Sequence, residues 1–136
     1  ESPGIIDREP VAVPLLTGMK VIDSTLPIGR GQRELIVGDK KSGKTSLALA
    51  ALINQKNNSE NNLPPVYGIY VLIGQKRDKA EEIIQILKDF GVMENSVVVA
   101  ALADDSLVSR YLAPYVGCTI GEYFRDRGED ALIVYD

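Results

Sequence analysis

One stretch of the sequence combines the residue types that bind phosphate groups. Residues 38–45 match the pattern G-x-x-x-x-G-K-[ST] at every fixed position. Gly38 and Gly43 let the backbone turn so that successive amide N–H groups face phosphate oxygens. Lys44 adds a positive charge for the β- and γ-phosphates, and Thr45 offers a hydroxyl to Mg²⁺. We predict that ATP or ADP binds to the whole loop: Gly38, Asp39, Lys40, Lys41, Ser42, Gly43, Lys44 and Thr45.

Asp136 is a candidate ligand for the same metal ion. It follows the apolar residues 131–134 and Tyr135. In the Walker B arrangement, a carboxylate at the end of a buried strand holds Mg²⁺ directly or through water. Any strand can end in an aspartate, so the phosphate loop upstream is what gives this pattern weight. We predict Thr45 and Asp136 as the Mg²⁺ ligands.

Gln75 bears on whether the site can hydrolyse a nucleotide. It follows Gly74 at the end of another apolar run, where it would lie near the γ-phosphate. A carboxylate there could accept the proton of an attacking water, but a neutral amide cannot. We therefore predict that the site has no catalytic residue, with Gln75 in place of a glutamate. Some GTPases orient water with a glutamine, so the residue type alone leaves hydrolysis open, as it does a purely structural role.

The composition excludes several other chemistries. Of the 136 residues, 45% are hydrophobic and 25% charged, the balance of one globular domain at most. With no histidine and one cysteine, Cys118, the chain can form no Ser-His-Asp triad, His-ligated metal site or internal disulfide. We expect Cys118 to be buried.

The net charge of −4 argues against nucleic acid as a ligand. Residues 30–45 nevertheless contain five basic residues against two acidic ones, which indicates a small anionic ligand. No apolar run approaches the ~18 residues of a membrane span, so we predict no direct membrane insertion.

The elements that would position these residues alternate between strands and helices. Apolar runs predict strands over 34–38, 66–73, 97–101 and 131–135. Helical spacing predicts helices over 44–56, 78–91 and 106–127. We expect Asp78 to cap the second helix and Pro114 to break the third into two pieces. The alternation predicts an α/β fold with a mostly parallel sheet and helices on both faces.

Two stretches lie outside this alternation. Residues 1–33 contain several prolines and glycines and are predicted to form an irregular lead-in segment, with a short helix that starts at Thr17. Residues 57–65 are polar, end in Pro-Pro and are expected to form an exposed loop. The sheet looks unfinished, because no helix follows the strand that ends at Asp136.

The motifs together resemble the nucleotide-binding domain of the alpha subunits of F-type ATP synthases, rotary ATPases of the RecA-like P-loop superfamily. The resemblance covers nearly the whole chain, and four of its most specific stretches are 27–36, 73–77, 111–115 and 121–126. It implies a RecA-like core that is truncated after the Walker B strand. Residues 1–33 would then be the lead-in, and 34–136 a P-loop domain that is incomplete at its C-terminus.

The resemblance also implies an activity and partners. Alpha sites bind Mg-ATP without turning it over, whereas the catalytic beta subunits carry a glutamate where this chain has Gln75. Alpha and beta subunits alternate in a hexameric ring with a central rotor stalk and a peripheral stalk, and the complex couples proton transport to ATP synthesis or hydrolysis. Such a chain would bind no nucleic acid and would lie on the soluble side of the mitochondrial inner or bacterial plasma membrane. The loop departs from the family at Lys40, Lys41 and Ser42, where Arg-Gln-Thr is usual; we expect phosphate binding to survive this change.

Three alternatives remain open on the sequence. A catalytic hexameric ring ATPase of the export type would need a carboxylate at position 75. A Rho-like RNA translocase shares the lead into the phosphate loop, but it would need basic residues and exposed aromatics that bind RNA. A nucleotide-sensing module without a motor would be a monomer or a simple dimer.

Overall fold

A three-stranded parallel sheet forms the centre of the fold. The computed structural model describes residues 4–136, so the predicted lead-in is described from Gly4 onward. Across the sheet the order is β4 (Ser96–Leu102), β3 (Val66–Gln75) and β5 (Asp130–Tyr135). Because β3 is central, it is buried on both faces, which explains its nearly continuous apolar sequence. All three strands run in the same direction, so their carboxyl ends share one edge.

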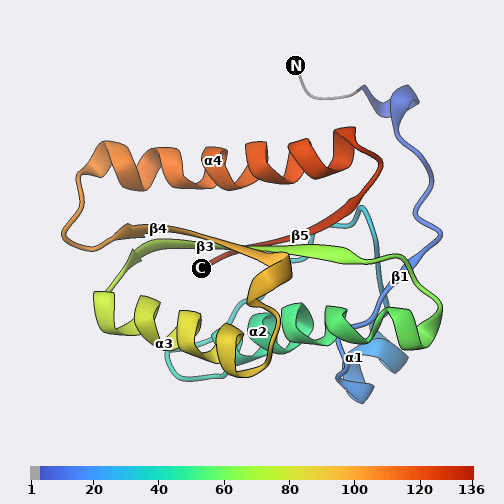
Figure 1. Ribbon diagram of the computed structural model, residues 1–136, viewed down its shortest axis with the longest axis horizontal. Helices are drawn as coiled ribbons and strands as arrows, with labels where there is room; N and C mark the ends of the chain where they lie inside the picture. The colour runs from blue at the N-terminus through green and yellow to red at the C-terminus, as the bar shows by residue number, and fades with distance from the viewer. Residues whose placement is uncertain (1–3) are drawn as a thin grey trace.

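Helices cover both faces of this sheet (Figure 1). The helix α4 (Leu107–Asp126) lies on one face, and α2 (Lys44–Asn54) and α3 (Arg77–Asp89) lie on the other. Glycines allow α4 to approach closely: a Cβ added at Gly117 would lie 2.4 Å from Val71, so no side chain fits there. The predicted α/β class, with a parallel sheet packed between helices, is confirmed.

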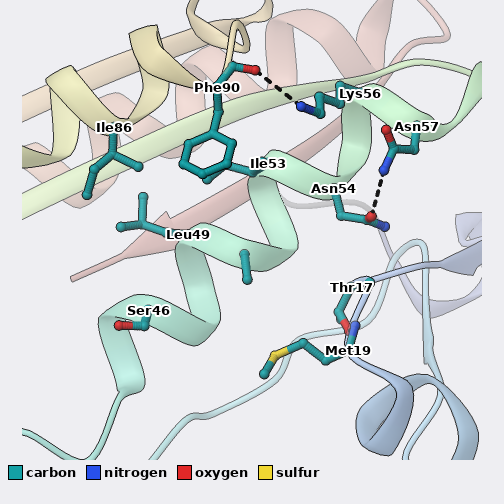
Figure 2. A pocket seen from close by; sticks show the side chains of 12 residues that line it. Thr17, Met19, Ser46, Leu49, Ile53, Asn54, Lys56, Asn57, Ile86 and Phe90 are labelled. Atoms are coloured by element: carbon teal, nitrogen blue, oxygen red, sulfur yellow. Dashed lines mark hydrogen bonds between the residues drawn. The ribbon is translucent and has the colours of Figure 1, made fainter.

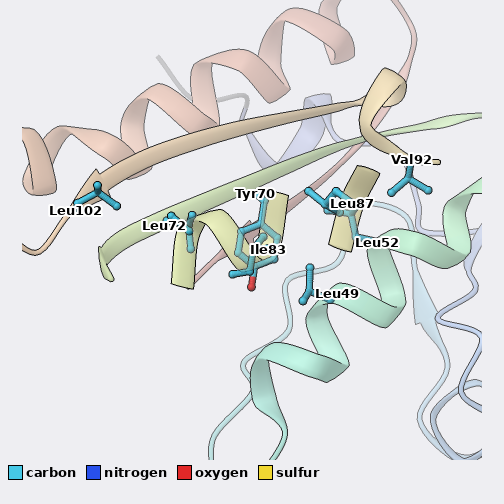
Figure 3. Close-up of a cluster of buried hydrophobic side chains, with 9 residues drawn as sticks. Leu49, Leu52, Tyr70, Leu72, Ile83, Leu87, Val92 and Leu102 are labelled. Atoms are coloured by element: carbon cyan, nitrogen blue, oxygen red, sulfur yellow. The ribbon is translucent and has the colours of Figure 1, made fainter. Parts of the chain in front are cut away.

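The core between the sheet and the helices α2 and α3 consists mainly of leucines, with an isoleucine, a valine, an alanine and one tyrosine (Figure 3). Tyr70, Leu72, Ile83 and Leu87 are completely inaccessible to solvent. Burying a side chain of this size stabilises the fold by about 1.5–3 kcal/mol. This cluster holds α2, and with it the end of the phosphate loop, against the sheet.

The lead-in segment is more ordered than its sequence suggests. The strands β1 (Pro14–Leu15) and β2 (Ile28–Gly29) pair in antiparallel fashion, and α1 (Lys20–Thr25) lies between them in the chain. This helix begins at Lys20 rather than at Thr17. Four short 3₁₀ helices complete the described elements: Ile5–Asp7, Gln55–Asn57, Ser59–Asn61 and Met93–Asn95.

The buried side chain of Arg30 attaches the lead-in to the rest of the molecule. Its guanidinium forms an ion pair with Asp130 at the start of β5 and donates to the carbonyl of Pro64 at 2.9 Å. Only 8% of the Arg30 side chain is exposed. Arg30 therefore connects β2, the 57–65 segment and the sheet.

The predicted strand over 34–38 is wrong. These residues are irregular, and Leu35 and Val37 are 85% and 80% exposed. A strand needs a neighbour that pairs with its backbone N–H and C=O groups. Within residues 4–136 no strand lies beside this segment, and β5 keeps a free edge. The apolar pattern is present, but the segment pairs with no strand among residues 4–136.

The predicted break at Pro114 is also wrong, because α4 is a single helix of 20 residues. A proline costs an interior helix about 3 kcal/mol. Ala113 and Gly117, on either side of it, are buried against the sheet, and this packing offsets the cost.

Three smaller expectations are corrected as well. Asp78 does not cap α3: the N-cap is Lys76, and Asp78 lies in the first turn, where its charge still suits the helix dipole. Cys118 is exposed, and its thiol lies within hydrogen-bonding reach of the half-exposed Tyr135 at the end of β5. The 57–65 segment is not wholly exposed, since Asn58 is buried and donates to Gln55 at 3.1 Å.

No helix among residues 4–136 combines the length and the hydropathy that crossing a membrane requires.

Candidate functional site

The loop over 38–43 leads directly into the N-terminus of α2. Gly43 is the N-cap residue and has a φ of +92°, in the left-handed region that favours glycine. No side chain caps this helix, and its first turn contains no acidic residue. The partial positive charge of the helix N-terminus is therefore available to an anion.

The loop folds tightly at its first glycine. A Cβ added to Gly38 would lie 2.6 Å from the hydroxyl oxygen of Ser42, closer than real Cβ contacts allow. Residues 38–43 are otherwise exposed. The loop can thus receive a ligand without first being uncovered by another described part of the chain.

The side chain of Lys44 lies over the loop's own backbone. Its Nζ donates to the carbonyl oxygens of Gly38 at 2.7 Å and Asp39 at 2.5 Å, and more weakly to Ser42 Oγ at 3.4 Å. The ammonium group therefore lies inside the turn that the loop makes. A bound phosphate would share or replace these acceptors and form charge-assisted hydrogen bonds instead.

Asp136 lies at the carboxyl edge of the sheet and is held there by its backbone. Its N–H donates to the carbonyl of Val71, and its own carbonyl accepts from the N–H of Ile73, both at 2.8 Å. The pairing between β5 and β3 thus continues through Asp136. Its carboxylate faces the same side of the sheet as Leu132 and Val134, which is the side covered by α2 and α3.

Three of the residues predicted from the sequence meet at this carboxylate. Thr45 Oγ1 donates to Asp136 Oδ2 at 3.2 Å, and Gln75 Nε2 lies 3.4 Å from Oδ1. The three come from α2, the end of β3 and the end of β5, which are up to 91 residues apart in the chain. Gln75 presents its amide to Asp136 and offers no group that could accept a proton from water.

Sequence reasoning missed Tyr70. Its hydroxyl donates to Asp136 Oδ2 at 2.8 Å, the shortest side-chain hydrogen bond to this carboxylate. Burial, together with the bond to Asp136, raises the pKa of Tyr70 above its usual value, so the phenol stays a neutral donor. The available signal was a polar hydroxyl in the middle of a mostly apolar strand. The contact itself needed the register between β3 and β5.

The arrangement fits an Mg²⁺ ion that arrives with a nucleotide. Mg²⁺ usually takes one or two protein oxygens and completes its shell with phosphate oxygens and water. The Thr45 hydroxyl and the Asp136 carboxylate provide two such oxygens, 3.2 Å apart. In the part of the chain that the structure describes, no group of three or more His, Cys, Asp or Glu could hold a metal by itself.

A separate hollow of about 470 Å³ lies between α2, the C-terminal end of α3 and the turn around Gly18 (Figure 2). Its lining is mainly apolar and includes Leu49, Ile53 and Phe90. The ammonium of Lys56 lies 5.7 Å from the Phe90 ring centroid and 3.4 Å from the carbonyl of the same residue. None of the residues 38–45 lines this hollow, so it is not the candidate phosphate site.

A parallel sheet, a phosphate-type loop at a helix N-terminus and a carboxylate at the adjacent strand end define an α/β domain of the nucleotide-binding class. In agreement, residues 18–136 match the ATP synthase alpha/beta family, nucleotide-binding domain. The chain belongs to this family.

Individual relatives agree with this assignment. The chain is 55% identical to the ATP synthase subunit alpha of Vibrio cholerae and of Cupriavidus necator, and 54% identical to that of Haemophilus influenzae. Each match extends over 135 residues, which is 99% of this chain and 25% of the relative. The chain therefore spans about a quarter of the length of these relatives. The resemblance to ATP synthase alpha subunits is confirmed.

Proposed function

We propose that this chain is part of the non-catalytic, Mg-ATP-binding alpha subunit of a rotary F-type ATP synthase. In this proposal the sheet and its helices are part of a RecA-like core, and β5 is the Walker B strand. Residues 1–33 are the lead-in, and 34–136 are the P-loop domain. Its relatives are named as alpha subunits, which supports the choice between the two members of the family.

One observation carries the proposal. Thr45, the last residue of the phosphate loop, lies with its hydroxyl 3.2 Å from the carboxylate of Asp136. This proximity at one end of the sheet supports a site in which the loop would bind phosphates and the two side-chain oxygens would bind Mg²⁺. Residues Gly38 to Thr45 would bind the nucleotide, and Thr45 and Asp136 the ion, which would neutralise phosphate charge.

Gln75 supports a site that binds without hydrolysing. Its amide lies 3.4 Å from Asp136 and cannot act as a general base at neutral pH. This property also argues against the catalytic export-type ATPase. The acidic net charge of −4 argues against an RNA translocase.

The partners follow from the same proposal. The chain would alternate with catalytic beta subunits in a hexameric ring around a central rotor stalk, with a peripheral stalk outside. Apolar side chains on the outer face of α4 support a protein neighbour, since Leu107, Tyr111 and Tyr115 are each more than half exposed. The assembly would lie at the surface of an energy-transducing membrane, mitochondrial or bacterial, and couple proton transport to ATP synthesis or hydrolysis.

The binding site is tested by Lys44→Ala, with Lys79→Ala on α3 as the control. Loss of a charge-assisted contact of about 1.5–3 kcal/mol should weaken ATP binding at least ~10-fold. Calorimetric titration of the full-length protein measures this directly. The ammonium of Lys79 pairs with Glu82 on the same helix, and the control should bind ATP normally. Equal affinity in a folded Lys44→Ala protein would refute the proposed site.

The absence of hydrolysis is tested separately in a single-turnover experiment. With the partner subunits' sites disabled, the site in this chain should retain intact ATP. Conversion of that bound ATP to ADP would show that the site is catalytic.

A further inference from the structure

Tyr70 is the one polar side chain in the buried cluster between the sheet and the helices α2 and α3. It lies in the middle of the central strand and is 0% exposed. Figure 3 shows its ring among the leucines, with the hydroxyl oxygen directed away from β3. That hydroxyl meets Asp136 Oδ2 at 2.8 Å. The phenol of Tyr70 thus connects this buried cluster to the candidate metal ligand Asp136.

We propose that Tyr70 is a positioning residue that sets the orientation of the Asp136 carboxylate for the Mg²⁺ of a bound nucleotide. The inference rests on the proposed function of this site. A buried hydroxyl needs some acceptor, and a backbone carbonyl would serve equally well. Here the acceptor is the carboxylate that would bind the ion, which is where a supporting hydrogen bond affects metal affinity.

The hydrogen bonds divide the two carboxylate oxygens into unequal roles. Oδ2 accepts both shorter bonds, from Tyr70 at 2.8 Å and from Thr45 at 3.2 Å. Oδ1 has only the 3.4 Å contact with Gln75. The phenol therefore fixes Oδ2 from the core side, and Oδ1 is the oxygen that is more readily available to a new partner.

Only the side chain of Asp136 depends on Tyr70. The Asp136 backbone is fixed independently, by its pairing with Val71 and Ile73. Removing the phenol hydroxyl should leave this pairing intact and free the carboxylate to rotate about its side-chain torsions. The ring would remain packed in the core, because phenylalanine has the same shape without the hydroxyl.

The same strand offers a matched control. Tyr67 lies three residues before Tyr70, and its ring stacks on Phe124 of α4 at a centroid distance of 4.2 Å, on the opposite face of the sheet. Tyr67→Phe removes a phenol hydroxyl from β3 without touching the site. Tyr67→Phe therefore shows how far the loss of a phenol hydroxyl from β3 changes ATP affinity when Asp136 is not involved.

The test compares ATP affinity with saturating Mg²⁺ and with EDTA, in the full-length protein. The ratio of the two affinities reports the contribution of the ion. Tyr70→Phe should lower this ratio about 10-fold, the lower end of the range for a lost supporting partner, while the affinity for metal-free ATP stays unchanged. Tyr67→Phe should change neither value. Mn²⁺ titration of the nucleotide-loaded protein, followed by its EPR signal, gives a second readout of the ion.

A double-mutant cycle with Asp136→Ala separates positioning from packing. If Tyr70 acts through Asp136, adding Tyr70→Phe to Asp136→Ala should not lower the ratio further. Three results would overturn the inference. Tyr70→Phe could lower the affinities for Mg-ATP and for metal-free ATP equally, or leave their ratio unchanged. It could also lower the ratio further in the Asp136→Ala background. The wild-type protein is measured first. If Mg²⁺ does not increase its affinity for ATP, the proposed function fails, whatever the role of Tyr70.

Discussion

The two halves of the candidate site are built in opposite ways. Asp136 is paired through its backbone to the most buried strand of the molecule and accepts three side-chain hydrogen bonds. The segment 34–43 pairs with no described strand, is exposed, and is braced mainly by Lys44, which bonds to carbonyls of the loop itself. Many hydrogen bonds therefore hold the candidate metal ligand Asp136 in place without any bound ligand. The candidate phosphate loop has few contacts that would prevent it from adjusting to a ligand.

The largest expected effect comes from two leucines, one in each half. Leu72→Ala on β3 removes a completely buried side chain and should lower the free energy of unfolding by about 2–5 kcal/mol. Leu35→Ala removes a side chain that is 85% exposed and should change it by less than about 0.5 kcal/mol. Urea denaturation of the 136-residue chain measures both. If Leu35→Ala lowered the free energy of unfolding as much as Leu72→Ala, the 34–38 segment would be packed in solution. The difference between the two halves of the candidate site would then disappear.

A smaller effect is expected at the connection between the two halves. Arg30 precedes the unpaired segment, and its guanidinium bonds to Asp130 and to the carbonyl of Pro64. Arg30→Ala should lower the free energy of unfolding by about 2 kcal/mol. This is less than the loss of one partner of a fully buried ion pair would cost, because the Asp130 side chain is 43% exposed. The exposed pair of Lys79 and Glu82 is the comparison, and Lys79→Ala should cost at most ~1 kcal/mol. Thermal unfolding measures both, and equal costs would mean that Arg30 does not connect the lead-in to the sheet.

The smallest expected effect is on the pH dependence of stability. Burial raises the pKa of Tyr70 above the usual 10, so the folded state keeps this proton when the unfolded state has lost it. The stabilisation is complete below pH 10 and is lost as the pH rises above it, by up to about 1.4 kcal/mol per pH unit. Tyr70→Phe should therefore lose less stability than wild type between pH 10 and 11, as measured by denaturation at each pH. Parallel curves for wild type and Tyr70→Phe would contradict the buried, neutral phenol.

Much of the fold followed from local sequence patterns. Buried strands over 66–73 and 97–101 and the helix from Lys44 were predicted within a few residues, because their apolar periodicity matches their burial. Two predictions failed because tertiary contacts, present or absent, decided the outcome rather than the local preference. Pro114 stays helical because the sheet packs against its neighbours, and 34–38 stays irregular because no described strand pairs with it.

The candidate site divides in the same manner. The loop residues Gly38 to Thr45 and the acidic Asp136 were recognisable from residue type and spacing, since phosphate and Mg²⁺ binding require those groups. Tyr70 was not, because a tyrosine in a strand is usually a packing residue. Its role depends on which strand lies next to β3.

By itself, the sequence determined the family of the chain, the chemistry of its loop and the alternation of strands and helices, since each depends on residues that are close together in the chain. Only the tertiary structure decided that Asp136, Thr45, Gln75 and Tyr70 meet at one carboxylate. The register of parallel strands is fixed by packing between segments that are far apart, and a local pattern carries no information about it.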